Sequence, residues 1–456
     1  MSQPAGRVPL PVFSSPPPAY AGPPASEIAM LRREYVNPGV FHYYKQPLCI
    51  VAGRMQYLWD DAGKRYLDAI AGIATVSVGH CHPHVTARAR EQLETLAHAT
   101  TIYLHPNMPL LARELARRMP PDSGLSSTYF ANSGAEANEL ALLMARLHTG
   151  RQDVLTLRGA YHGGTLATMS LTAVGTWKFP VPTAAGVRHV PPGYCYRCPL
   201  GLKYPSCEVR CARSIEEVIR HETSGEIAAF IAEPIQGVGG VVTPPPEYFA
   251  IAYEIVRKFG GLCISDEVQT GFGRTGAHFW GFENWGVTPD AVTVAKGIAN
   301  GAPLSAVITR REIAQHLAKR VHFSTFGGNP VVTAQGLATL EVMERESVQR
   351  RAAEIGGYLR EKLDALVERH ALIGEVRGIG LMLGVELVRD RQSREPATAA
   401  TAAVLELARE RSLLLGRGGL FGNVLRIKPP MCLTRDDCDF LADCLDECLA
   451  LAAAGA

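Results

Sequence analysis

Residues 262–271, with the sequence LCISDEVQTG, form a short apolar run that ends on an acid, Asp266, and passes into a turn. Residues 291–297, AVTVAKG, repeat the pattern and end close to Lys296. From about residue 83 to residue 329, runs of this kind alternate with amphipathic, helix-like segments. This alternation is typical of a mostly parallel sheet covered by helices on both faces. We therefore expect an α/β fold with both side chains at strand ends, near the crevice where such folds bind ligands.

The regions on either side predict a second, smaller domain. Residues 55–67 alternate polar and apolar side chains around an Asp-Ala-Gly turn, which is a hairpin pattern. Asn329 is a good helix cap, and Pro330 suits the first turn of the helix that begins there. The expected division is a Pro-rich N-terminal arm at 1–30, the first part of a small domain at 31–85, a large domain at 86–328 and an α+β remainder of the small domain at 329–456.

The composition is that of a globular protein with a large core. Of the 456 residues, 47% are apolar and 20% are charged, and the formal net charge is +2. This charge gives no reason to expect nucleic acid or an anionic membrane as a partner. No apolar run reaches the roughly 20 residues that a membrane span needs. Residues 1–24 lack the features of a secretion or mitochondrial signal, so we expect a cytoplasmic protein with a loose N-terminal arm.

Two further patterns fit parts of one ligand. In residues 132–138, NSGAEAN, the small residues Ser133, Gly134 and Ala135 open a helix whose N–H groups favour a phosphate. A Ser-Gly pair is also a common plain helix cap. In residues 159–164, GAYHGG, Tyr161 can lie flat against a planar ring. A surface turn with a chance pair of Tyr161 and His162 would give the same pattern.

Lys296 and Asp266 would supply the reactive groups. A lysine between apolar and small residues is poorly solvated, which makes its amine nucleophilic, although most lysines are solvated surface groups. A carboxylate at a strand end can bind a metal, act as an acid or base, or pair with a cationic ring nitrogen. Together, the four patterns outline a phosphate, a flat ring, a ring nitrogen and an aldehyde. Pyridoxal 5'-phosphate has these features, and we expect it as the cofactor.

The chain resembles the class III aminotransferases of the fold-type-I pyridoxal-phosphate family from about Tyr43 to its last helix. The segments DEVQTGFGRTG, AKGIANG and TFGGNP are highly specific for the class. GIATVSVGHCHP, NSGAEANELALLMAR, RGAYHG and EPIQGVGGVV are most similar to the second type of alanine–glyoxylate aminotransferase and its bacterial relatives. The resemblance implies a large domain with a mostly parallel seven-stranded sheet and a smaller α+β domain.

The resemblance also implies roles around the cofactor. Lys296 would hold it as a Schiff base and move a proton during the reaction, while Asp266 would keep the ring nitrogen protonated. Val268 would pack on the ring face opposite Tyr161, and Gln269 would hydrogen-bond the phenolic oxygen. Thr325 would reach the phosphate of a neighbouring subunit, so a homodimer or a tetramer is expected. The implied cofactor contacts are Ser133, Gly134, Ala135, Tyr161, His162, Glu233, Asp266, Val268, Gln269, Lys296 and Thr325, with Glu233 equally suited to a structural hydrogen-bonding role.

The resemblance also implies residues that would bind the substrate. Arg426 matches the arginine that grips a substrate carboxylate, and a planar guanidinium suits that task. Relatives that alternate between glutamate and an ω-amino substrate carry a glutamate that masks this arginine, where this chain has Val238. Arg417 is the second candidate, and either arginine could be a solvated surface charge. Tyr43, Ile73 and Tyr103 match positions that line the substrate cleft, Tyr103 from the partner subunit, or else are ordinary core residues.

The expected activity is transfer of an amino group from an amine or amino acid, such as alanine, to pyruvate or glyoxylate by a ping-pong mechanism. A lyase or epimerase acting on an amino-phosphate or amino acid is the alternative on the same scaffold. A non-catalytic cofactor-binding protein should have lost Lys296 or Asp266, and both are present.

Three other patterns are set apart from the active site. The GxGxxG match at 271–276 has no convincing helix after it, which argues against a dehydrogenase. The adjacent histidines and cysteine of 80–84 point to opposite faces of an extended segment, so no metal site is expected. A Cys-rich insertion at 191–213 could bind a structural zinc, form disulfides or keep free thiols. Its cysteines are Cys195, Cys198, Cys207 and Cys211.

Overall fold

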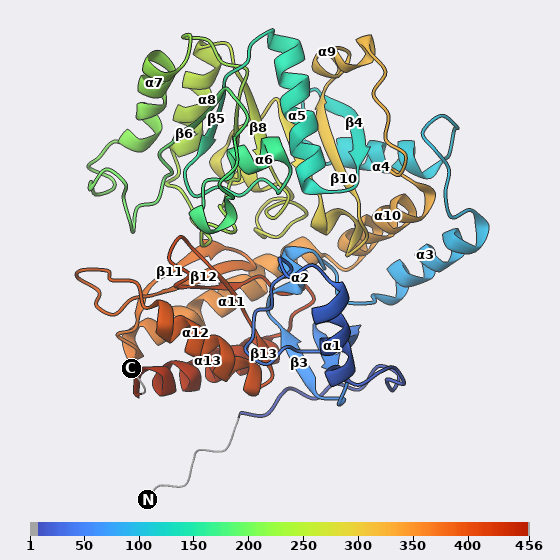
Figure 1. Cartoon of the computed structure of the whole chain (residues 1–456), viewed down its shortest axis with the longest axis vertical. Helices are drawn as coiled ribbons and strands as arrows, with labels where there is room; N and C mark the ends of the chain where they lie inside the picture. The colour runs from blue at the N-terminus through green and yellow to red at the C-terminus, as the bar shows by residue number, and fades with distance from the viewer. Residues whose placement is uncertain (1–7, 455–456) are drawn as a thin grey trace, which may run out of the picture.

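The computed structural model describes residues 8–454. Its largest sheet has seven strands in the order β4-β10-β9-β8-β7-β5-β6, between helices in the upper body of Figure 1. Neighbouring strands are parallel except at β10, which is antiparallel to β4 and β9. This confirms the predicted α/β fold. The strands are β4 (Leu125–Ala131), β5 (Val154–Leu157), β6 (Val187–Val190), β7 (Ala229–Ala232), β8 (Leu262–Asp266), β9 (Ala291–Val294) and β10 (Ser305–Arg310).

Alternate residues of the central strands face different helices. Leu262 and Ile264 of β8 pack in the same cluster as α5 (Gly134–Thr149). Cys263 packs with α7 (Arg210–Glu222) and α8 (Tyr248–Lys258) on the other face. Because side chains alternate along a strand, Asp266 is in phase with Leu262 and Ile264. The strand period therefore directs this acid toward α5.

The lower body of Figure 1 holds two smaller sheets. Strands β2 and β3 pair antiparallel with Tyr57 opposite Leu67, which confirms the predicted hairpin. Strand β13 pairs in parallel with β3, so segments from both ends of the chain share a sheet. The domain boundaries given above stay a prediction. One sheet contains β1 (Ile50–Arg54), β2 (Tyr57–Asp60), β3 (Arg65–Asp68) and β13 (Leu413–Leu414); the other contains β11 (Ile373–Ile379), β12 (Met382–Leu387), β15 (Val424–Ile427) and β14 (Gly416–Gly418).

Helix α10 (Pro330–Arg345) begins at the predicted signal. The Asn329 side chain accepts hydrogen bonds from the backbone N–H groups of Val331 and Val332, and Pro330 occupies the first turn, as predicted. The α-helices besides α5, α7 and α8 are α1 (Ala25–Tyr35), α2 (Ala71–Ala74), α3 (Pro83–Thr95), α4 (Asn107–Ala116), α6 (Leu166–Leu171), α9 (Arg311–Ala314), α10 (Pro330–Arg345), α11 (Val348–Arg369), α12 (Thr398–Glu410) and α13 (Arg435–Ala454).

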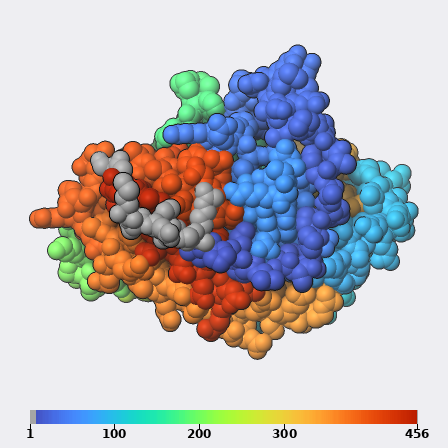
Figure 2. Space-filling model, turned by 90° about the horizontal axis from the view of Figure 1, so that it is seen from below, coloured from blue at the N-terminus to red at the C-terminus, as the bar shows by residue number. Residues whose placement is uncertain are grey.

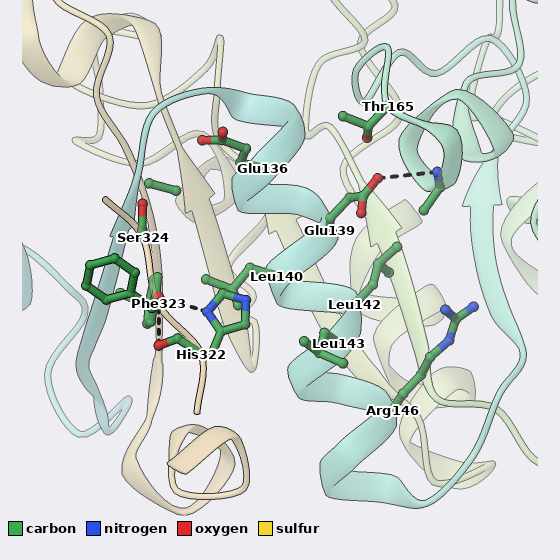
Figure 3. A pocket seen from close by; sticks show the side chains of 13 residues that line it. Glu136, Glu139, Leu140, Leu142, Leu143, Arg146, Thr165, His322, Phe323 and Ser324 are labelled. Carbon is green, nitrogen blue, oxygen red and sulfur yellow. Dashed lines mark hydrogen bonds between the residues drawn. The ribbon is translucent and has the colours of Figure 1, made fainter. Parts of the chain in front are cut away.

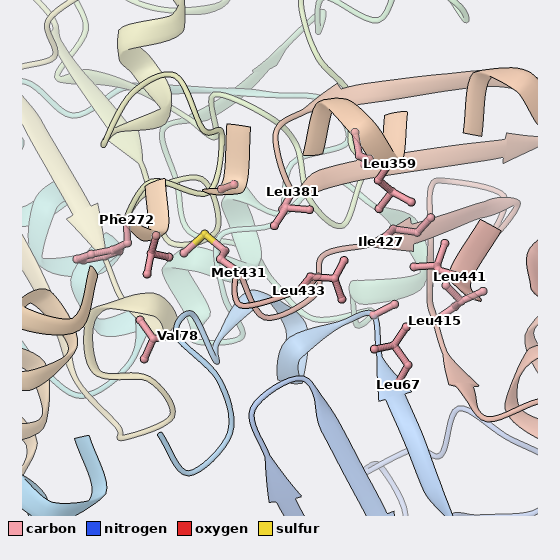
Figure 4. Packing of buried hydrophobic residues seen from close by; sticks show 14 of the residues in the cluster. Leu67, Val78, Phe272, Leu359, Leu381, Leu415, Ile427, Met431, Leu433 and Leu441 are labelled. Atoms are coloured by element: carbon pink, nitrogen blue, oxygen red, sulfur yellow. The ribbon is translucent and has the colours of Figure 1, made fainter. Parts of the chain in front are cut away.

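One apolar core runs through both bodies of the molecule. It includes Val292 and Val294 of β9, directly before Lys296, and Leu425 and Ile427 of β15, on either side of Arg426. The strand before Lys296 and the strand that contains Arg426 are thus held by the same apolar core. Figure 4 shows part of this core, with labelled side chains from Phe272 and Val78 at one end to Leu67 and Leu441 at the other.

The N-terminal segment packs against this core over part of its length. Val8, Leu10 and Phe13 are partly buried on it, and the Phe13 ring centroid is 4.9 Å from that of Tyr57. Figure 2 shows this blue segment beside the red C-terminal part of the chain. The expected arm is therefore docked at these residues, while residues 1–7 lie outside the described part. Within residues 8–454, no helix has the length and apolar character needed to cross a membrane.

Candidate active site

A cavity of about 420 Å³ opens where the carboxyl ends of β8 and β9 meet the N-terminus of α5. It brings together most of the residues predicted to contact the cofactor, which come from five separate stretches of the chain. Ten of them line it: Ser133, Gly134, Ala135, Tyr161, His162, Glu233, Asp266, Val268, Gln269 and Lys296. Thr325 does not line it and is exposed, which fits a residue that acts on another subunit.

Asp266 is buried and held by three donors. The amide of Asn138 donates to Oδ2 at 2.9 Å, and Nδ1 of His162 lies 2.7 Å from the same oxygen. The backbone N–H of Val268 donates to Oδ1 at 3.1 Å. Thr156 lies 3.1 Å from Nε2 of His162, so this hydroxyl can donate to Nε2 and leave the proton on Nδ1 for Asp266. The carboxylate is thus fixed as an acceptor that faces the cavity.

The neighbouring acid, Glu267, has a different environment. Its oxygens accept hydrogen bonds from Ser265, Thr270, Gly281 and Phe282, at 2.7–3.1 Å. Burial raises the pKa of Glu267 to about 7, against the effect of these four donors. Glu267 does not line the cavity. It therefore ties the turn after β8 to the segment that follows Trp280, and only Asp266 of the adjacent pair serves the site.

Lys296 follows β9 with a left-handed backbone, at a φ of 46°. Such a φ is uncommon for a non-glycine residue and is often found at functional sites. Burial lowers the pKa of Lys296 and the nearby charge of Arg426 acts in the same direction, while Asp266 and Glu233 oppose the change. A lysine of this kind has a larger share of nucleophilic, neutral amine at neutral pH than an exposed lysine.

The N-terminus of α5 lies at the position predicted for an anion site. Ser133 caps the helix: its side chain accepts from the N–H of Glu136, whose carboxylate accepts from the N–H of Ser133 in return. Within residues 8–454, the N–H groups of Gly134 and Ala135 donate to no protein group. Two free N–H groups at a helix N-terminus suit a phosphate.

Glycines keep the walls of the cavity close together. A Cβ on Gly134 would lie 3.2 Å from Cγ1 of Val268, and one on Gly163 would lie 2.5 Å from Cβ of Ala135. Gly163 also has a φ of 136°, which side-chain-bearing residues rarely adopt. With the free N–H groups, the Asp266 acceptor and the Lys296 amine, these narrow walls fit a flat, phosphorylated, aldehyde-bearing ring.

Glu233 forms hydrogen bonds of the structural kind that the sequence analysis considered, and it also lines the cavity. Its two oxygens accept from the N–H groups of Tyr161, at 3.0 Å, and Gly237, at 2.8 Å. Burial raises the pKa of Glu233. These bonds place the Tyr161 segment against the cavity, and the carboxyl adds a negative charge near Lys296.

Arg426 is buried beside this cavity, whereas Arg417 is exposed. Nη2 of Arg426 donates to the Tyr43 hydroxyl at 2.9 Å, and its buried Nε has no partner among the described residues. A Cβ on Gly418 would lie 2.8 Å from Nε of Arg426, so the glycine leaves room for the guanidinium. No carboxylate in residues 8–454 forms an ion pair with Arg426, in agreement with Val238 at the masking position.

None of the five predicted substrate residues, Arg426, Arg417, Tyr43, Ile73 and Tyr103, is among those that line the cavity. Ile73 is 38% exposed and Tyr103 is 66% exposed, and neither lines the cavity. Ile73 has a φ of 68°, which is strained for a β-branched residue. The structure also reveals Lys428, fully buried and bonded to Gln269, which the sequence analysis missed. The sequence did hold one sign of this: Lys428 comes two residues after Arg426 in the LRIKPP segment, and side chains two residues apart on a strand lie on the same face.

The three patterns that the sequence analysis separated from the active site are the histidines of 80–84, the GxGxxG match and the four cysteines of the insertion. His80, His82 and His84 each pair with a different acid, so they do not converge. The element directly after the GxGxxG match is a short 3-10 helix, Gly281–Trp285, and not the long helix of a dinucleotide-binding fold. The four cysteines of the insertion are free thiols in this structure, and no cluster of metal-ligating side chains is present within residues 8–454.

Comparisons with known proteins find relatives that match most of the chain. The family model for Aminotransferase class-III matches residues 41–449. The Arabidopsis thaliana protein alanine--glyoxylate aminotransferase 2 homolog 2, mitochondrial, is 50% identical over 437 residues, which cover 96% of this chain and 90% of that protein. The Homo sapiens alanine--glyoxylate aminotransferase 2, mitochondrial, is 43% identical over 438 residues, with 92% and 85% covered.

Two solved structures illustrate the shared fold. An (S)-enantioselective omega-transaminase from Thermomicrobium roseum has a TM-score of 0.87 and 36% identity, over 95% of this chain and all of that one. A phospholyase from Arthrobacter in complex with phosphoethanolamine has a TM-score of 0.86 and 34% identity, over 93% and 99%. The expectation of a cytoplasmic protein is wrong, because both curated relatives described above are mitochondrial proteins.

Proposed function

Because this chain belongs to the class-III aminotransferase family, we propose that it moves an amino group from alanine, or a similar amine donor, to glyoxylate or pyruvate by a ping-pong mechanism. The family accounts for the aminotransferase activity and implies pyridoxal phosphate. The choice of substrates is the proposal. Its main support is that Lys296, Asp266 and the α5 N-terminus line one cavity, with an unmasked arginine beside it.

The described residues fit the cofactor in four places. The N–H groups of Gly134 and Ala135 would bind its phosphate, Tyr161 and Val268 would border its ring, and Asp266 would accept from its ring nitrogen. When bound, pyridoxal phosphate supplies an aldehyde that can hold an amino group and a cationic ring that withdraws electrons from the neighbouring carbon.

The side chains of this chain would carry the remaining work. Lys296, whose pKa is lowered by burial, would act as the base that takes a proton from the substrate carbon and would deliver it to the cofactor carbon. The Asn138 amide and His162 would hold Asp266 in the acceptor state, since both donate to the carboxylate. A fixed negative charge costs no reorganisation during the reaction.

Arg426 would select the substrate. The guanidinium of Arg426 is buried, its Nε has no partner, and no carboxylate of residues 8–454 pairs with it, which suits a bidentate contact with an α-carboxylate. Alanine, pyruvate and glyoxylate all carry such a group next to the reacting carbon. Arg426 could therefore keep one position in both half-reactions, without the glutamate that other family members use as a mask.

The same proposal includes a dimer. A second cavity, of about 460 Å³, lies on the outer face of α5, between that helix and the segment of His322, Phe323 and Ser324 (Figure 3). Leu143 lines it and is 38% exposed, and Phe326 nearby in sequence is 60% exposed. Large exposed apolar side chains around such a hollow favour a subunit contact. Thr325, between Ser324 and Phe326, would then belong to the contact.

The test is a single half-reaction. Purified protein loaded with pyridoxal phosphate is mixed with L-alanine and no acceptor, and pyruvate is measured. We expect about one pyruvate for each subunit with a change in cofactor absorbance, and glyoxylate should then restore the first spectrum. A protein that yields no oxo acid with any amino donor, but releases ammonia from phosphoethanolamine, would be a lyase instead.

A further inference from the structure

Lys428 is the one lysine in the described chain that is completely buried, and the proposed function does not use it. It follows β15, and its backbone N–H donates to the carbonyl of Ala69 at 2.8 Å. Side chains two residues apart on an extended segment share a face, so Lys428 points to the same side as Arg426. A buried amine is costly unless it is hydrogen-bonded, which raises the question of what it holds.

Its partner is a residue of the candidate active site. Nζ of Lys428 donates to Oε1 of Gln269 at 2.6 Å, and Gln269 lines the cavity with Lys296 and Asp266. No carboxylate within residues 8–454 forms an ion pair with Lys428. The amide of Gln269 packs on Gly237, where a Cβ would lie 2.4 Å from both Nε2 and Oε1. Gln269 is therefore held between a glycine and a lysine.

This contact decides which end of the amide faces the cavity. In the structure Lys428 is the donor and Oε1 is the acceptor, so Nε2, the other end of the amide, faces away from the lysine. Nε2 donates to no group in the described chain, although Gln269 borders the cavity. A hydrogen-bond donor is thus presented to a bound ligand, with its direction fixed from behind.

The charges around Lys428 favour the neutral form of its amine. Burial lowers the pKa of Lys428 well below its usual range, and the cations of Arg426, Lys296 and Arg274 act in the same direction, against Glu233. A neutral amine keeps two N–H groups, so Lys428 can donate a hydrogen bond to Oε1 of Gln269 in either protonation state.

We propose that Lys428 is a positioning residue that fixes the Gln269 amide with its N–H toward an oxygen on the bound cofactor ring. The inference rests on the proposed function, since it needs pyridoxal phosphate in the cavity. A donor held against the ring oxygen stabilises its deprotonated form. Without Lys428 the amide is free to rotate, so deprotonation of the bound cofactor requires a higher pH.

The test is a titration of the bound cofactor, followed by its visible absorbance. In Lys428→Met, we expect the midpoint pH of the absorbance change to rise by about one unit, the size of one ordinary hydrogen bond. In Gln269→Leu the midpoint should also rise, and adding Lys428→Met to that variant should cause no further shift. Lys319→Met, at an exposed lysine, is the control and should match the parent protein.

Three results would overturn the inference. One is an unchanged midpoint in folded Lys428→Met that retains the cofactor, and another is an equal shift in the Gln269→Leu background, because Lys428 would then act directly. If Lys428→Met does not fold, Lys428→Gln takes its place with the same criteria. The third is a parent protein that binds no pyridoxal phosphate, which would refute the proposed function as well; the first two leave that function standing.

Discussion

Nδ1 of His162 lies 2.7 Å from Oδ2 of Asp266, although the two residues are 104 positions apart in the sequence. The segment after β5 and the end of β8 meet here, and the Asn138 amide of α5 joins them at 2.9 Å. This network holds the acid that would face the cofactor nitrogen. It suggests that the charge of Asp266, and not only its shape, matters for the activity.

Asp266→Asn should separate shape from charge. The substitution keeps the size of the side chain but removes the negative charge opposite the ring nitrogen, so pyruvate formation from L-alanine should slow by roughly 10²- to 10³-fold. Stopped-flow absorbance with the cofactor-loaded variant measures this rate. A variant that retained cofactor and reacted at the parent rate would remove Asp266 from the mechanism.

Glu267→Gln should change stability and its dependence on pH. The pKa of Glu267 is about 7 in the folded chain, against 4.5 for an unperturbed glutamate. Between these values only the unfolded chain has lost the proton, so this residue makes the free energy of unfolding fall, by about 3 kcal/mol in total, as the pH rises from 4.5 to 7.

Chemical denaturation of both proteins at pH 5 and pH 8 measures the effect. The fall between these pH values should be smaller in Glu267→Gln than in the parent, whatever the constant loss from its four hydrogen bonds. Parallel pH profiles for the two proteins would mean that Glu267 is ionised in the folded chain throughout this range.

Arg426→Gln should affect substrates according to their carboxylate. Loss of a charge-assisted contact should raise the KM for L-alanine by roughly 10- to 100-fold, while an amine donor without a carboxylate should be nearly unaffected. Arg417→Gln is the matched comparison, because that arginine is exposed. Steady-state kinetics with both donors measures these effects. A larger rise in the KM for L-alanine in Arg417→Gln than in Arg426→Gln would make Arg417 the arginine that binds the carboxylate.

Leu143→Glu should break the proposed dimer. A carboxylate on the outer face of α5 would be buried without a partner in a subunit contact, weakening the dimer by about 100-fold or more. Light scattering coupled to size exclusion reports the mass, and activity should fall with the dimer fraction. Leu451→Glu, at an exposed position of α13, should change neither, and a fully dimeric, active Leu143→Glu would place the contact elsewhere.

Much of the fold could be predicted because its strands are short apolar runs with clear ends. The runs that end at Asp266 and Lys296 became β8 and β9, and period two explains why Asp266 faces α5 while Cys263 does not. Strand β10, Ser305–Arg310, was not anticipated. It is antiparallel to both neighbours, so the alternation of strand and helix does not point to it.

The site could be predicted where the chemistry is local, and less well where it depends on distant contacts. Ser133, Gly134 and Ala135 act through a helix start that the sequence itself signals. The contact between Lys428 and Gln269 joins residues 159 positions apart and has no local pattern. Nor could spacing distinguish Arg426 from Arg417, because only the folded chain shows which of them is buried.

The most direct test of the central claim is to find the amine that holds the cofactor. The protein is loaded with pyridoxal phosphate, reduced with borohydride, digested and mapped by mass spectrometry. The cofactor mass should appear on the peptide that contains Lys296, once per subunit, and should be absent in Lys296→Ala. A label on Lys428 or a surface lysine in place of Lys296 would contradict the convergence of four chain segments on one cofactor.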